Sequence, residues 1–545
     1  MESKNKAHGL YPFYFFAAFI GGFFLWSSLR TTPPQSSELA SLSVPSAQDA
    51  IPISPDLLLD TQQFLQFVNN PQKFTHQTCA PFLHEVLGAI EQKDPGSFNY
   101  ALTRQNYLAI IQNLWSIRLS LHDRLRELTQ NGDIHVGATD DPCVNAIRDT
   151  FRAARYLEDF LGESFLGIPN FNEKTDPKAI NTLQGDAPHL LKAPGVETVT
   201  LRSGDMILSR GTAYTSAAIA RIGTVRSQFS HLAVIYIENE PLGKEFTIPE
   251  AMTNPHVKVL EAHIEVGSTI RPFKDYVADG NARNVLFRYS DASVANEAAK
   301  WAHDFIVQHR IEQQRKNGGA IDDPNNNVPY DFKMNLGDLS EIFCSEMGFI
   351  AYRSVGIILP QFPSILESHN DVVRTLGITR LLNFAPGDLE FDTRFQYLAE
   401  WRDYRKMHDI RYKDAVLDSM FDWMRDKNYQ LHSTVMMEGK AIFGWMIRHA
   451  EFAKTTLPKN MSTSVLRMTF TINQVGDILA NDLAQIEKKH QSDYSGRLMT
   501  YPEVLDALEK FRAQDTDLYT ANHVSKFHQL LHSQAEFNLR RENTP

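Results

Sequence analysis

Cys344 lies in the run DLSEIFCSEMGFI (residues 338–350), where its thiol could act as a nucleophile. Asp338 or Ser340 can cap a helix from about Leu339 to Arg353, which predicts Cys344 in the first turns of that helix. The positive end of the helix dipole and the backbone amides there favour the thiolate, the nucleophilic form of cysteine. The same amides can hold the oxyanion that forms during acyl transfer.

A cysteine nucleophile needs a base that is close in space but not necessarily in sequence. His231 opens the apolar run 232–237, directly after Ser230 and a mostly polar turn at 226–229. This pattern predicts a histidine at the mouth of a strand, where its side chain can project into a cleft. The ordinary pKa of histidine, near 6.5, suits proton transfer. We therefore expect His231 to be the base and Ser230 to contact the substrate.

A third group should orient the imidazole of His231. Glu261 ends the next β-rich run, 257–260, and hairpin pairing could bring it beside His231. His263 and Glu265 are alternatives on the same stretch, and spacing alone does not separate the three. A metalloenzyme is disfavoured, because His231, His256 and His263 lack HExxH-like spacing. No metal or other cofactor is expected.

The pattern of apolar residues divides the chain into five parts. We expect an anchor at 1–30, a linker rich in Ser and Pro at 31–54, a helical bundle at 55–193, a catalytic domain at 194–363 and a helical region at 364–545. Within the catalytic domain, short β-rich runs precede segregated helices, which indicates an α+β fold.

Four short motifs occur in one order: LRSGDMIL at 201–208, FSH at 229–231, LEA at 260–262 and FCSE at 343–346. This order resembles the circularly permuted NlpC-type papain-like hydrolases, the YiiX/YebB-like group, over roughly residues 198–363. The resemblance implies a permuted papain-like (NlpC-type) domain with an antiparallel barrel or sheet and a catalytic helix. All-helical regions would flank this domain, and one transmembrane helix would precede it.

Carried over residue by residue, the resemblance implies Cys344 as nucleophile, His231 as base and Glu261 as orienter. Tyr330 and Asp331 are similar to a Tyr-Asp segment of that family and are expected to line the substrate pocket. The chain departs from the family in a polar, insert-like loop at about 316–327, which could cover the cleft.

The N-terminus carries an uncharged, strongly apolar segment from Leu10 to Leu29, long enough to span a bilayer as a helix. Lys4 and Lys6 precede it, whereas Arg30 stands alone beyond it until Lys73. This asymmetry predicts a single-pass anchor with a cytoplasmic N-terminus. With the resemblance, it predicts a bacterial inner-membrane protein whose catalytic domain is periplasmic.

The formal net charge of -11 and the absence of a long basic run argue against a nucleic-acid partner. The three cysteines are too widely spaced for a zinc finger. In an oxidising compartment Cys79 and Cys143 could pair and leave Cys344 free, and three unpaired thiols are the alternative.

These observations predict a membrane-anchored cysteine hydrolase or acyltransferase, of amidase or peptidase type. It would cleave an amide or ester bond through a thioester, on an acyl-, lipid- or peptide-bearing substrate associated with the cell envelope. The alternative is a catalytically silent, membrane-tethered binding or scaffolding protein that uses the same fold. The complete set of Cys344, His231 and Glu261 favours the enzyme, since a degenerate domain would be expected to have lost one of them.

Overall fold

The computed structural model describes residues 56–536, apart from 73, 92–98, 168–174, 176–187, 224–225, 369, 435–436 and 439–459. Within these described residues, none of the helices combines the length and apolar character needed to cross a bilayer. The anchor predicted at 10–29 lies outside the described residues, as do the rest of 1–30 and the linker at 31–54.

The centre of the molecule is a seven-stranded sheet in which every neighbouring pair is antiparallel. Its strands are, in spatial order, β1 (Leu190–Lys192), β11 (Phe395–Arg402), β8 (Arg283–Tyr289), β3 (Met206–Arg210), β4 (His231–Ile237), β6 (Val257–His263) and β7 (Gly267–Pro272). A separate pair, β2 (Thr200–Arg202) and β5 (Glu245–Thr247), lies outside this sheet. Most of these strands coincide with the short β-rich runs of the sequence.

The predicted fold class is wrong about the two regions that flank the catalytic domain, which were expected to contain helices only. They are not all-helical: β1 precedes residue 194, and β11 follows residue 363, yet both strands belong to the central sheet. The region 364–545 also forms the pairs β9–β10 (Ser364–Ile365 with Leu382–Asn383) and β12–β13 (Tyr429–Leu431 with Leu531–Ser533). The chain is a mixed α/β protein, because strand pairing across long sequence separations prevails over the local helical pattern.

Both faces of the sheet are buried. Leu208, Leu232 and Leu260 point toward one face, whereas Ile207, Ile235 and Val259 point toward the other, as alternation along a strand requires. The first face is covered by α9 (Ala292–Asn317) and α10 (Glu346–Arg353), and the second by α7 (Ile248–Thr253) and α8 (Phe273–Ala278). The cores beneath these helices hold the strands that carry the candidate site.

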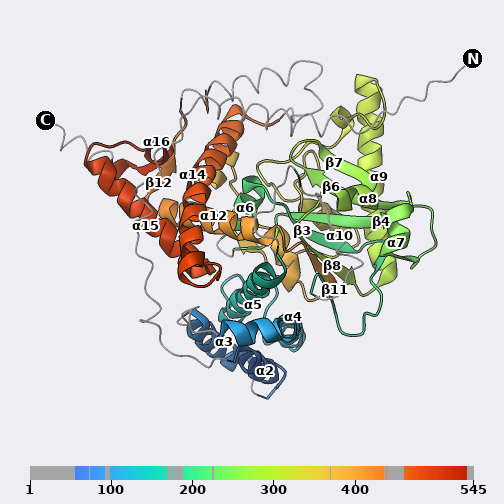
Figure 1. Ribbon diagram of the computed structural model, residues 1–545. Helices are drawn as coiled ribbons and strands as arrows, with labels where there is room; N and C mark the ends of the chain where they lie inside the picture. Colours follow the sequence, from blue (N-terminus) through green and yellow to red (C-terminus); the bar gives the residue numbers. More distant parts are fainter. Residues whose placement is uncertain are drawn as a thin grey trace, which may run out of the picture.

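Among the residues that the structure describes, four helices precede the sheet: α2 (Leu57–Val68), α3 (His76–Glu91), α4 (Tyr100–Gln130) and α5 (Pro142–Leu166). They gather below the sheet in Figure 1, and α5 is the one nearest to the rest of the molecule. Asp141 caps α5, with Pro142 at the first helical position, an arrangement that is typical of a helix start. A disulfide between Cys79 of α3 and Cys143 of α5 closes this bundle, and Cys344 is the free cysteine.

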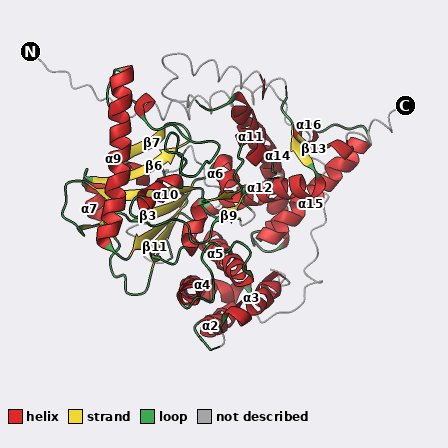
Figure 2. Ribbon diagram, turned by 180° about the vertical axis from the view of Figure 1, so that it is seen from behind, coloured by secondary structure: helices red, strands yellow, loops and turns green. Residues whose placement is uncertain are grey.

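A second group of helices follows the sheet: α12 (Met407–Lys427), α14 (Thr463–Asp493), α15 (Tyr501–Thr520) and α16 (Lys526–Leu530). The view from behind in Figure 2 shows α12, α14 and α15 on the opposite side of the sheet from α9. The short elements α6 (Tyr214–Arg221), α11 (Asp371–Leu376), η5 (Pro324–Asn326) and η6 (Pro386–Phe391) complete the described structure.

Buried ion pairs connect α5 to the helix before it and to the sheet. Arg118 of α4 forms a double hydrogen bond with the Glu158 carboxylate of α5, at 2.9 and 2.8 Å. Its remaining terminal nitrogen donates to Glu400 of β11 at 2.8 Å. All three side chains are fully buried. A buried charge is tolerated only when it is paired, so each of these residues constrains the position of the other two.

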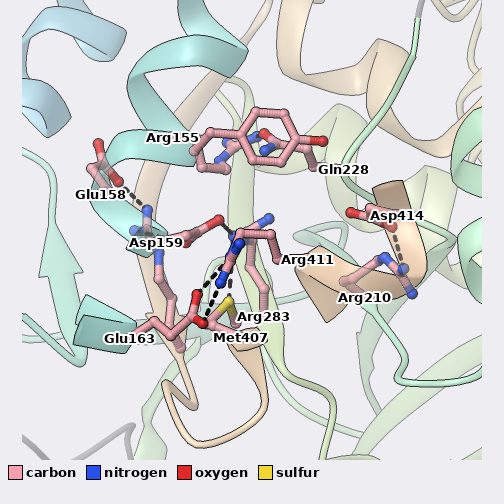
Figure 3. Close-up of polar contacts among 12 residues, drawn as sticks. Arg155, Glu158, Asp159, Glu163, Arg210, Gln228, Arg283, Met407, Arg411 and Asp414 are labelled. Carbon is pink, nitrogen blue, oxygen red and sulfur yellow. Dashed lines mark hydrogen bonds and ion pairs between the residues drawn. The ribbon is translucent and has the colours of Figure 1, made fainter. Parts of the chain in front are cut away.

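The same helix holds the C-terminal region by a second set of charges (Figure 3). Glu163 of α5 accepts two hydrogen bonds from Arg411 of α12, at 2.9 and 2.8 Å. One turn earlier, Asp159 pairs with Arg283 of β8. Helix α5 therefore contacts the bundle, the sheet and α12 through charged groups that exclude water.

We expect Arg118→Met to lower the free energy of unfolding by about 3–5 kcal/mol, because it leaves Glu158 and Glu400 buried without this cation. Urea titration followed by tryptophan fluorescence measures the change. The control is Lys510→Met, which removes an exposed pair with Asp506. It should change the free energy by less than about 1 kcal/mol. Equal effects of the two substitutions would contradict a stabilising role for the buried pairs.

Loss of the disulfide should also destabilise the protein. The two half-cystines are 64 residues apart, and a loop of this length corresponds to about 4 kcal/mol of stabilisation when it is closed. We expect the double substitution Cys79→Ser, Cys143→Ser to lower the urea midpoint accordingly. Alkylation of the unfolded wild-type protein should modify one thiol before reduction and three after it. Three modified thiols without reductant would contradict the pairing.

Candidate active site

His231 is the first residue of β4, at the open end of the sheet. Its Nε2 atom lies 2.8 Å from Oε2 of Glu261 on the neighbouring strand β6. A carboxylate only accepts hydrogen bonds, so Nε2 is the donor and Nδ1 remains for a second partner. Cys344 lies beside the same imidazole, lines the same cavity and contributes to the shift in the pKa of His231. The structure thus brings the three predicted catalytic side chains into contact.

Cys344 lies directly before α10 and not within its first turns. The helix begins at Glu346 with Ser345 as its cap, so the predicted start at about Leu339 is seven residues too early. Residues 337–343 instead form turns that Glu346 holds by accepting the backbone N–H groups of Gly337 and Phe343, at 2.5 and 3.3 Å. The thiol of Cys344 is 5% exposed and lies 3.7 Å from the carbonyl oxygen of Ser230.

Close contact between α10 and the sheet brings Cys344 to His231. Gly348 of α10 packs against Leu232 and Met206, where an added Cβ atom would lie 2.8 Å and 3.0 Å from their side chains. An added side chain would therefore require these neighbouring side chains to shift. The glycine allows α10, which directly follows Cys344, to pack closely on the strand that begins with His231.

Glu261 is fully buried and is the centre of a charged cluster. Its Oε1 atom lies 3.1 Å from Nε2 of His263 and also accepts a hydrogen bond from Arg271 of β7. Burial alone would raise the pKa of Glu261, but the charges of His263 and Arg271 and the hydrogen bond from His231 hold it well below its usual value. Glu261 therefore remains a carboxylate that can orient and charge the base.

Burial alone would lower the pKa of His231, because it disfavours the charged imidazolium. Hydrogen bonds to Cys344 and Glu261, together with the negative charge of both partners, outweigh burial and raise the pKa of His231 to about 10. The geometry therefore favours a protonated His231 at neutral pH, poised to give its proton to a leaving group.

A cavity of about 220 Å³ opens beside the three residues. Five of the predicted site residues line this one cavity: Cys344, His231, Glu261, Ser230 and Tyr330. The remaining lining residues come mainly from α6 and the β6–β7 turn and are predominantly polar: Thr215, Ser216, His263, Glu265, Arg271, Asp279 and Asn281. Such a lining suits a substrate that carries polar groups near its scissile bond.

Tyr330 is held next to the nucleophile by backbone pairing. It forms an isolated parallel bridge with Ile342, and its carbonyl oxygen accepts a hydrogen bond from Asn460 at 2.6 Å. Its side chain lies beside Cys344, with which it lines the cavity. Burial, with the adjacent Cys344, raises the pKa of Tyr330 well above its usual value, so the hydroxyl stays protonated as a donor.

Asp331 is adjacent in sequence but does not line the cavity. Its carboxylate accepts the backbone N–H groups of Lys333 and Asn335, at 2.8 and 2.5 Å, and is 1% exposed. This residue stabilises the turn that leads toward Cys344. Contrary to expectation, Asp331 is thus not part of the cavity wall and instead holds the backbone that follows Tyr330.

The insert-like loop does not cover the cleft. None of the described residues between 316 and 327 lines the cavity. The segment is held away from the cavity by two side-chain amides. Asn326 donates a hydrogen bond to the carbonyl oxygen of Ala320, and Asn327 donates one to the carbonyl oxygen of Val266, both at 2.9 Å. The polar side chains of this loop therefore form hydrogen bonds to backbone carbonyl groups, and the loop is not a lid over the cavity.

Arg271 was not identified from the sequence, although one signal was present. Val259 pairs with Arg271 and Glu261 pairs with Thr269, so residues 259, 261 and 263 share a face with 269 and 271. Polar residues that alternate on both strands of a hairpin, about the glycine at 267, indicate a polar cluster at the end of that face. A strand-by-strand comparison would have placed Arg271 and His263 beside Glu261.

The same register gives the cluster the composition of a metal site. His231, Glu261 and His263 each offer one donor atom, and the three atoms lie within 4.8 Å of one another. Spacing along the sequence missed this grouping, because the residues meet across two strands and not along one helix. In the described structure, Arg271 occupies one carboxylate oxygen of the group.

Comparisons of the chain with protein-family models, with curated proteins and with solved structures find no match.

We expect Glu261→Gln to lower the pKa of His231 by at least about 1, because the substitution removes the adjacent negative charge. This pKa is measured by NMR titration of protein with isotope-labelled histidine. The His231 resonance is assigned by its loss in the His231→Ala variant. In wild type the resonance should titrate near pH 10 and not near 6.5. The stabilisation gained from protonating His231 should be complete below about pH 6.5 and lost as the pH rises through about 10. A wild-type value near 6.5 would contradict the charged cluster.

Proposed function

We propose that the protein is a cysteine hydrolase or acyltransferase that cleaves an amide or ester bond through a thioester on Cys344. The observation that carries the proposal is the contact of Cys344, His231 and Glu261 at the wall of one cavity. The four ordered motifs that resemble permuted NlpC-type hydrolases support the same chemistry.

In the first step, His231 holds the proton of the Cys344 thiol on its Nδ1 atom, the Cys344 sulfur attacks the carbonyl carbon of the substrate, and the carbonyl oxygen becomes negative. The Tyr330 hydroxyl, which lines the cavity together with Cys344, can donate a hydrogen bond to the developing charge. This donor is preorganised, since the bridge between Tyr330 and Ile342 fixes the backbone of Tyr330 before substrate binds.

Collapse of this intermediate breaks the bond to the leaving group. Protonated His231 transfers its Nδ1 proton to the departing nitrogen or oxygen, which leaves a thioester on Cys344 and a neutral imidazole. The imidazole then accepts a proton from water or from another acceptor as that group attacks the thioester. Glu261 holds Nε2 throughout, so the ring neither turns nor loses its orientation.

The compartment and the substrate class follow from features outside the site. The disulfide Cys79–Cys143 supports an oxidising compartment, and the charge pattern of 1–30 supports a single membrane anchor with the catalytic part outside the cytoplasm. We therefore infer a bacterial inner-membrane enzyme that acts on a lipid-, acyl- or peptide-bearing substrate of the cell envelope.

Full-length protein in detergent should release p-nitrophenol from acyl esters in a burst, and intact mass should show one acyl group on Cys344. Chain length and polar head group are varied to define the substrate. We expect Cys344→Ala to abolish the burst and His231→Ala to slow it about 10²–10⁴-fold. His256→Ala is the matched control, because this half-exposed histidine precedes the same strand as Glu261 but lies outside the cavity.

An acyl adduct that forms equally well without His231, or one that forms on another residue, would overturn the proposed triad. A protein that binds such substrates without acylation would instead fit the silent binding module.

A further inference from the structure

Two histidines flank opposite oxygens of one buried carboxylate. Nε2 of His231 lies 2.8 Å from Oε2 of Glu261, and Nε2 of His263 lies 3.1 Å from Oε1. The two imidazole rings are 5.0 Å apart between centroids. The catalytic chemistry proposed above uses His231 and Glu261 but gives no role to His263.

We propose that His231, Glu261 and His263 form a binding site for a divalent transition ion of the zinc type, and that this ion switches the enzyme off. Two imidazole nitrogens and a carboxylate oxygen are a donor set that Zn²⁺ accepts, with bonds of about 2.0–2.2 Å and a water in the fourth position. The three donor atoms lie within 4.8 Å of one another, so small side-chain rotations bring them around one ion.

The strands make this site rigid. His231 begins β4 and His263 ends β6, and these two strands pair directly, with Glu261 on the same face of β6. The carboxylate is fully buried, whereas the two histidine side chains are 17% and 23% exposed toward the cavity. An ion can therefore enter from the cavity without any movement of the sheet.

Arg271 is the internal competitor for the ion, because it donates to Oε1 of Glu261. Its guanidinium also pairs with Asp279, which lines the same cavity. When an ion takes the carboxylate, Arg271 can keep this second partner and need not become an unpaired charge. Glu261 thus exchanges one cation for another.

This inference rests on the proposed function, because the inhibitory effect follows from the role of His231. The ion takes the place of the proton that Nε2 shares with Glu261, and that proton leaves to solvent. The other ring nitrogen, Nδ1, then keeps its proton toward Cys344, because releasing it would create a metal-bound imidazolate. His231 can then no longer accept the proton of the Cys344 thiol, so the nucleophile is not formed and the catalytic cycle stops at its first step.

Binding is measured first and without turnover, by calorimetric titration of full-length Cys344→Ala with zinc chloride. We expect one ion per chain, and binding at least about 10-fold weaker when His263→Ala is added. Adding His256→Ala instead should leave the affinity unchanged, since this histidine lies outside the cavity. Equal affinity with and without His263 would overturn the site, as would an absence of binding.

Cobalt then reports which side chains are ligands in the wild-type protein. A spectrum free of a thiolate-to-cobalt charge-transfer band is expected, because Cys344 faces the other nitrogen of His231. Such a band would place the ion on Cys344 and overturn the proposed ligand set.

The inhibitory part is tested with whichever ester gives a burst. Zinc should abolish acylation of wild type and His256→Ala, and the concentration needed should rise at least about 10-fold for His263→Ala, each compared with its own zinc-free rate. Equal sensitivity of His263→Ala would overturn the switch. A protein that binds zinc through His263 but acylates no ester would instead count against the proposed hydrolase.

Discussion

The buried charges of α5 are the constraint on which the rest of the structure depends. One helix carries Glu158, Asp159 and, one turn further on, Glu163, and each carboxylate meets an arginine from a different part of the chain. Apolar packing would allow these parts to slide, whereas a buried ion pair has one acceptable geometry. The bundle, the sheet and α12 are therefore held in a fixed relative position. The strands that carry His231 and Glu261 belong to this sheet and are held with it.

The candidate site repeats this principle on a smaller scale. Glu261 satisfies its buried charge with three partners, and only one of them, His231, is required by the proposed chemistry. The other two keep the carboxylate ionised in a place where burial alone would neutralise it. A buried catalytic carboxylate thus needs positively charged neighbours to stay ionised. This is why His263 and Arg271 join Cys344, His231 and Glu261 in one cluster.

Residues whose roles are local could be predicted from the sequence. Cys344, His231 and Glu261 meet because each stands at the end of an element with a clear pattern, and the cap of α5 at Asp141 follows from a short motif. Long-range pairing could not be predicted in this way. β1 pairs with β11 across more than two hundred residues, and a three-residue strand such as Leu190–Lys192 has no periodicity to reveal it. The start of α10 was also misplaced, because Glu346 caps backbone groups through tertiary contacts that no local signal encodes.

The strand order has a consequence for synthesis on the ribosome. β8 pairs with β3 early, but its other edge stays open until Phe395–Arg402 has emerged, and β1 has no neighbour in the sheet before then. A nascent chain therefore exposes the unpaired edge of β8 while more than a hundred further residues are translated. Such an edge invites pairing with other chains. Protection by a chaperone is thus most valuable between the completion of β8 and that of β11.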